Sequence, residues 1–276
     1  MKKLLVLFLM LAMLTIYAAA EDEGIGLSVG LEFGIYDASK KTGDEMYPYL
    51  APMVIYENSF LDGALDLFVE LDYIFNTTKG TNQDGDEVFP QDLYFGLSLG
   101  YNLFLGEAST LSFILDNEID TLTISPRFDD SNNINGILIP SVKFNQTLDF
   151  GDLYAQVDLP INYVTYVKDN DLGLDLDFTF GWQSNFGLGL MFAEHNNIKP
   201  KAGYAGFDMI VSYENGPVYF EVEVDTYNET GAGITIAPEF DFFFNSFTFY
   251  TNCIFDGIGG DGDVIISPAI GVKFSF

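Results

Sequence analysis

The last nine residues, Pro268 to Phe276, read PAIGVKFSF and alternate strictly in polarity. The apolar positions are Pro268, Ile270, Val272, Phe274 and Phe276, and the positions between them are Ala269, Gly271, Lys273 and Ser275. A period of two residues is the pattern of a β-strand with one apolar side. Such a strand needs an apolar environment for that side, and the same need recurs along the chain.

Alternation of this kind fills most of the sequence, and residues 172–182 give the cleanest case. No stretch keeps a 3.6-residue apolar stripe, so the chain is predicted to be all-β. The pattern indicates about 14 strands, with 12 as the alternative. Their predicted spans are 24–36, 46–57, 64–75, 92–105, 110–124, 136–149, 153–167, 172–183, 186–194, 202–214, 217–228, 232–244, 247–256 and 263–276.

The predicted connections alternate between long and short. Long ones include residues 76–91 and 125–135, whereas residues 184–185, 215–216 and 245–246 form tight turns. Long loops alternating with short turns are typical of a transmembrane up-and-down barrel, whose long loops are extracellular and whose turns are periplasmic. A closed barrel also gives every strand a backbone partner, as a membrane requires. Proline removes a donor from the ladder, so pairing defects are expected at Pro52, Pro140, Pro238 and Pro268.

The N-terminus predicts an exported protein. Lys2 and Lys3, an apolar run over residues 4–16 and Ala18-Ala19-Ala20 form the three parts of a secretory signal peptide, residues 1–20. Residues 21–276 would then form one barrel domain with a formal charge of 9 − 41 = −32. A charge of this sign argues against nucleic acid as a partner.

Gly271-x-x-Phe274-x-Phe276 resembles the C-terminal assembly signal of bacterial outer-membrane β-barrel proteins. The resemblance implies insertion by the barrel-assembly machinery through the last strand, contact with outer-membrane lipid, and a double-membraned bacterium. The size and the few residues before the first strand, which leave no N-terminal plug, are similar to those of monomeric 14-stranded porins. This similarity to porins extends over the whole mature chain, but it concerns the predicted architecture and no sequence motif.

The polar face of the predicted strands collects carboxylates at i, i+2 spacing. They are Asp66, Glu70, Asp72, Asp116, Glu118, Asp120, Asp175, Asp177, Glu221, Glu223, Asp225, Glu239 and Asp241. Only Lys143 and Lys273 are expected as basic residues on this face. Rings of carboxylates favour cations, so the pattern predicts a porin-like pore that passes small hydrophilic solutes and prefers cations. A non-conducting surface barrel that acts as an adhesin or antigen through its loops is the alternative.

Small residues on the polar face, among them Gly96, Gly100 and Gly181, favour open space in the lumen, whereas inward aromatic residues would narrow it. No catalytic constellation, cofactor site or metal site is predicted, and the protein is not expected to be an enzyme. His195, the single histidine, is expected in a solvated loop. The acidic segments 82–87 and 256–263 lack the full ligand spacing of a calcium loop, so calcium binding there is left open.

Overall fold

The computed structural model describes residues 26–36, 47–77, 80–81, 87–88, 91–124, 134–165, 173–199, 206–226, 234–244, 246–259 and 264–276. The predicted signal peptide, the loop at residues 82–86 and residues 260–263 of the acidic 256–263 segment lie outside these residues. Within the described part of the chain, no helix is long and apolar enough to cross a membrane.

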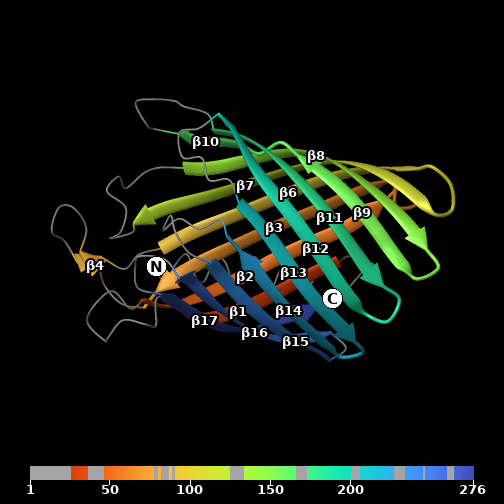
Figure 1. The fold of residues 1–276 in the computed structure, drawn as a ribbon. Helices are drawn as coiled ribbons and strands as arrows, with labels where there is room; N and C mark the ends of the chain where they lie inside the picture. Colours follow the sequence, from red (N-terminus) through yellow and green to blue (C-terminus); the bar gives the residue numbers. More distant parts are fainter. Residues whose placement is uncertain are drawn as a thin grey trace.

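Strands make up nearly all of the described structure (Figure 1). The longer strands are β1 (Gly26–Tyr36), β2 (Tyr47–Phe60), β3 (Leu65–Asn76), β6 (Gln91–Phe104), β7 (Ser109–Ile124), β8 (Ile134–Leu148), β9 (Gly151–Asp158), β10 (Ile161–Thr165), β11 (Gly173–Ser184), β12 (Leu188–Lys199), β13 (Gly206–Asn215), β14 (Val218–Asp225), β15 (Ile234–Phe244), β16 (Phe247–Ile258) and β17 (Ile265–Ser275). The two-residue strands β4 (Gly80–Thr81) and β5 (Glu87–Val88) pair only with each other.

The sheet closes on itself as an antiparallel barrel. Strands that follow one another in the chain pair, β3 pairs with β6 past the separate β4–β5 pair, and β17 pairs with β1 from Ser28↔Ser275 to Gly34↔Ala269. β9 and β10 both pair with β8 and with β11, each in one continuous register across Leu159 and Pro160. They therefore count as one interrupted strand. The barrel has 14 strands, as predicted, and the 12-stranded alternative is wrong.

The two ends of the barrel differ as the alternation of loop lengths predicted. At one end, which we call the turn end, the strands are joined by residues 61–64, 105–108, 149–150, 185–187 and 216–217, and Ser246 lies at the same end between β15 and β16. These turns are gathered at one end of the barrel in Figure 1. Leu61 and Asp62 have φ of 56° and 57° in the first of them, next to Gly63 with φ 82°. The strand ends that flank the longer connections of the sequence lie at the opposite end.

The four prolines singled out in the sequence lie beside gaps in the ladder. Pro52 of β2 pairs in register with β1, and Pro238 of β15 pairs in register with β14. Toward the other neighbouring strands, β3 and β16, the ladder has no pair at either proline. The β1–β17 pairing ends at Ala269, the residue that follows Pro268, and Pro140 faces the Leu159–Pro160 interruption. The missing donor is thus tolerated as a pairing defect, without a register shift at any of the four.

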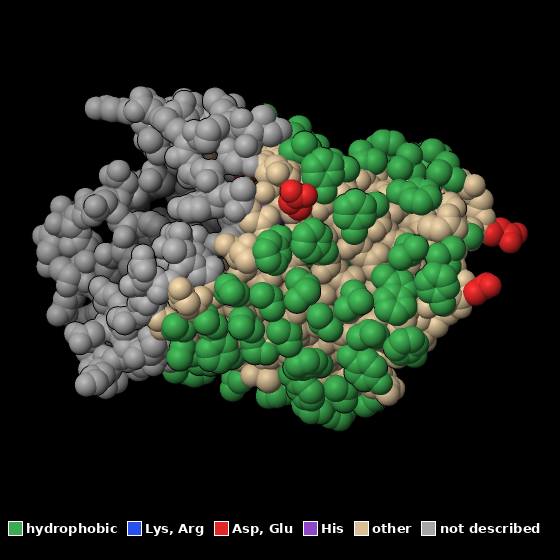
Figure 2. Space-filling view, in the orientation of Figure 1, with side chains coloured by type: hydrophobic (Ala, Val, Ile, Leu, Met, Phe, Trp, Pro, Cys, Tyr) green, Lys and Arg blue, Asp and Glu red, His purple; other side chains and the backbone are tan. Residues whose placement is uncertain are grey.

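The outer face of the barrel is apolar. Exposed side chains there include Phe180 (58% exposed), Ile270 (49%) and Phe274 (46%). Figure 2 shows hydrophobic side chains over the visible described surface, with a few acidic ones and most of these at one end. Because so much apolar surface has no partner within the chain, this face suits a lipid environment.

Candidate functional site: the barrel lumen

The inner face of the wall holds the carboxylates predicted from the sequence. The register places Asp66, Glu70 and Asp72 of β3 opposite Gly100, Gly96 and Tyr94 of β6, and these in turn opposite Ile114, Glu118 and Asp120 of β7. The same alternation continues around the barrel. It sets the following on the face opposite the apolar side chains: Asp116, Asp175, Asp177, Glu221, Glu223, Asp225, Glu239, Asp241, Lys143 and Lys273.

Carboxylates lie directly opposite one another at three places on neighbouring strands. The pairs are Asp158↔Asp177, Asp208↔Asp225 and Glu221↔Glu239. Like charges in such positions destabilise a sheet. Of the facing acids expected on the β14–β15 hairpin, only Glu221 and Glu239 meet, because Asp241 is opposite Tyr219. The wall therefore needs protons, cations or basic side chains at these positions.

His195 supplies a basic side chain between two of these pairs. Its Nδ1 is 3.1 Å from Asp177 Oδ2 and its Nε2 is 2.7 Å from Asp208 Oδ2, with a quarter of its side chain exposed. Ionised carboxylates only accept hydrogen bonds, so the geometry needs N–H groups on both ring nitrogens, which makes the ring cationic. Placing His195 in a solvated loop was wrong: β12 runs on to Lys199, because its pairing with β11 continues through the polar residues Asn196 and Asn197.

The two lysines are held differently from His195. Lys143 Nζ lies 4.5 Å from the centroid of the Tyr154 ring, and Lys273 Nζ lies 5.4 Å from that of Tyr250. A cation over an aromatic face is attracted by the ring quadrupole. Lys273 also interacts electrostatically with carboxylates on both sides of β17: Glu70, Asp72, Glu239 and Asp241.

Tyrosine rings lie against the inner wall over glycines of the neighbouring strand. Tyr49 covers Gly34, Tyr154 covers Gly181 and Tyr250 covers Gly271, and a Cβ on any of these glycines would collide with the ring. The reading of Gly181 as open space is therefore wrong, because the Tyr154 ring fills the place above it. A ring seated in this way lies along the wall. At Gly96 and Gly100 no ring is seated: a Cβ would lie 3.1 Å from the Tyr94 hydroxyl and 3.4 Å from Asp66, respectively.

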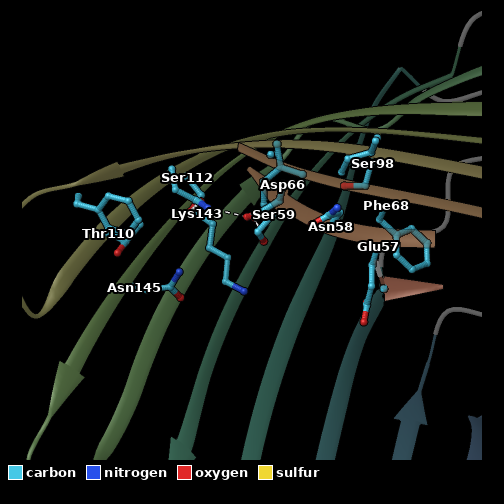
Figure 3. Close-up of a pocket in the computed structure, with 16 residues that line it drawn as sticks. Glu57, Asn58, Ser59, Asp66, Phe68, Ser98, Thr110, Ser112, Lys143 and Asn145 are labelled. Atoms are coloured by element: carbon cyan, nitrogen blue, oxygen red, sulfur yellow. Dashed lines mark hydrogen bonds between the residues drawn. The ribbon is translucent and has the colours of Figure 1, made fainter. Parts of the chain in front are cut away.

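A cavity of about 780 Å³ opens into the lumen near the turn end, between β2–β3 and β7–β8 (Figure 3). Asp66 lies at the centre of a hydrogen-bond network on its wall. Ser59 Oγ donates to Asp66 Oδ1 at 2.5 Å, and Asn102 Nδ2 donates to Asp66 Oδ2 at 2.6 Å. Ser112 Oγ in turn donates to Asn102 Oδ1 at 2.6 Å. Charged lining residues besides Asp66 are Glu57 and Lys143.

Several charged groups of the inner face were absent from the predicted set, among them Glu32, Glu57, Asp158, His195 and Asp208. Glu32 accepts a hydrogen bond from Tyr49 Oη at 2.7 Å, and Asp158 accepts one from Gln156 Nε2 at 2.7 Å. Asp158 and Asp177 are each only 9% exposed. Strict continuation of the alternation along each strand would have found these residues, because they share the parity of their inward neighbours.

The residues of the C-terminal motif divide between the two faces. Phe274 and Phe276 are about half exposed on the outer face, and Phe274 packs edge-on against Phe247 at 5.2 Å between centroids. Gly271 is buried on the inner face beneath Tyr250. Among the residues that the structure describes, no group of three or more His, Cys, Asp or Glu side chains is arranged to hold a metal ion.

No family model matches the chain, and no curated protein matches it. Solved structures that resemble it include mutants of the porin of Rhodopseudomonas blastica. Two of them, one a triple mutant, have a TM-score of 0.43 and 10% sequence identity over 91% of this chain and 100% of theirs. The barrel assignment stands on the strand pairing alone.

Proposed function

We propose that the protein is an outer-membrane pore that lets small hydrophilic solutes diffuse passively and that prefers cations. The observation that carries this proposal is one wall with two faces: an apolar outer face around a closed 14-stranded barrel, and an inner face rich in carboxylates. Barrels of about eight strands are filled by side chains, whereas larger ones hold water. Carboxylates around a water-filled path attract cations and repel anions.

The route to the membrane is part of the same proposal. We infer export by the signal peptide at residues 1–20 and insertion through the C-terminal motif with Gly271, Phe274 and Phe276, in the outer membrane of a double-membraned bacterium. The barrel acts there without enzymatic chemistry. A heat-modifiable shift on a gel tests the folded barrel, and a protein that remains soluble without detergent contradicts membrane insertion.

Planar-bilayer recording tests the pore itself. The purified barrel is expected to give stepwise conductance in KCl, and a reversal potential of cation sign in a KCl gradient. A barrel that inserts but never conducts would instead support a surface protein that works through its loops. A reversal potential of anion sign would contradict the cation preference alone.

A further inference from the structure

Two opposite charges face the cavity near the turn end without an ion pair. Lys143 and Glu57 both line it, and within the described residues neither has a salt-bridge partner within 4.0 Å. Lys143 contacts the Tyr154 ring, and its electrostatic attraction to Asp158 acts over a longer distance. Figure 3 shows the Lys143 and Glu57 side chains reaching into the open space from different strands. Water is their default partner, and a ligand with complementary charges could replace it.

The wall between these charges is built from fixed groups that hydrogen-bond. Ser59, Asn102 and Ser112 are tied together through Asp66, so these side chains are already ordered before a solute arrives. Ordered groups bind at a lower entropic cost than mobile ones. These groups use their protons within the wall, so they offer a peptide N–H only acceptor oxygens, whereas Thr110 and Asn145 of the same lining can also donate. Phe68 adds an apolar surface to the same cavity.

We propose that this cavity is a binding site for short zwitterionic peptides, with the peptide carboxylate toward Lys143 and the ammonium toward Glu57. The inference rests on the proposed pore for access from the lumen. A simple anion would meet the acidic wall before it reached Lys143. A peptide with one charge at each end has no net charge to repel, and it matches both unpaired side chains.

The spacing of the strands sets the length of the peptide. β2 and β8 are four strand positions apart, which is roughly 19 Å along the wall, and the two long side chains shorten the gap. Two to four extended residues reach about 7 to 14 Å. Tri-alanine is therefore the matched probe, and N-acetyl tri-alanine amide, which has the same backbone and no terminal charges, is its control.

Equilibrium dialysis of labelled tri-alanine against the full-length barrel in detergent tests the site. Wild type is expected to bind tri-alanine more tightly than the uncharged control. Lys143→Gln and Glu57→Gln are each expected to weaken binding about tenfold, the effect of one charge-assisted hydrogen bond. The double variant Lys143→Glu with Glu57→Lys is expected to bind again, with the peptide reversed. A gel shift on heating confirms that each variant folds.

Each outcome is decisive for one proposal. Equal affinity of wild type for tri-alanine and for the uncharged control would overturn the peptide site, as would single variants that bind like wild type. If the barrel conducts KCl without binding tri-alanine, only the peptide site fails. If it binds tri-alanine in the predicted way but never conducts, only the pore fails, because dialysis in detergent needs no conduction.

Discussion

Positive charge is held in two different ways in the wall of this barrel. His195 sits between Asp177 and Asp208, with both ring nitrogens satisfied by carboxylates of the neighbouring strands. Lys143 reaches into a cavity, where the Tyr154 ring orients it and no carboxylate of the described residues lies within salt-bridge distance. The charge of His195 is neutralised within the wall, where it offsets the repulsion between facing carboxylates. The charge of Lys143 remains available to a solute in the lumen. A positive charge therefore stabilises the fold in one region and can bind a ligand in the other.

Removing the charge of His195 should have the largest effect on stability. His195→Gln leaves Asp177 and Asp208 without their cation beside Asp158 and Asp225. Breaking a fully buried pair costs about 3–5 kcal/mol, and this side chain is one quarter exposed, so we expect a loss of about 2–3 kcal/mol. Urea unfolding in detergent at pH 7 measures it. Lys143→Gln is the matched control and should cost less, about 0.5–1 kcal/mol, because this half-buried lysine loses only its contact with the Tyr154 ring.

Because His195 is the single histidine of the chain, its charge between Asp177 and Asp208 can be observed directly. Barrel labelled with ¹⁵N-histidine and free of a histidine tag gives one imidazole, and both ring nitrogens are expected to carry a proton at pH 7. A neutral tautomer, with one protonated nitrogen, would contradict the role assigned to His195. Equal losses of stability in His195→Gln and Lys143→Gln would also erase the contrast between the two regions.

The Tyr154 ring connects the two regions, because it lies on Gly181 of β11, the strand next to that of His195, and also lies beneath Lys143. Gly181→Ala should push the ring off the wall, since the new methyl group would occupy the place of the ring. Overpacking of this kind costs about 1–2 kcal/mol, and the displaced ring should lower single-channel conductance. Gly216→Ala is a poor control because of its φ of 60°. Gly100→Ala, whose new Cβ would be no closer than 3.4 Å to Asp66, is the better one.

The network in the cavity should contribute least to stability. Asp66→Ala removes the acceptor of Ser59 and Asn102, but the freed donors face a wet cavity and can bind water. We expect a loss of about 1 kcal/mol, the usual net value of an intramolecular hydrogen bond. Urea unfolding again measures it. A loss larger than that of His195→Gln would reverse the ranking of the two regions.

The sequence predicted the barrel well because strand alternation, turn length and closure all follow from one requirement. The wall must have an apolar outer face and a polar inner face. The sequence predicted the inner face of β3 and β7 for the same reason. It failed at His195, since the polar run with Asn196 and Asn197 has the composition of a loop, and only pairing with β11 extends the strand. It also failed at Gly181, because the residue that fills the space above a glycine comes from another strand.

The cavity could not have been predicted in the same way. Glu57, Asp66 and Lys143 come together through the curvature of the closed sheet and across several strands. Alternation assigns each of them to the inner face but says nothing of their height along the barrel. Register is what brings Ser59 opposite Asp66 and Asn102 opposite Ser112. Local patterns thus fix the faces of the wall, and long-range pairing fixes the sites on it.

The reversal potential of single channels in a KCl gradient at pH 7 tests the central claim most directly. The acidic inner face predicts a potential of cation sign for the wild type. It also predicts a smaller potential for a variant with Glu221→Gln and Glu239→Gln, which removes one facing pair of carboxylates. A potential of anion sign, or a variant indistinguishable from the wild type, would contradict the claim that these carboxylates set the ion preference of the lumen.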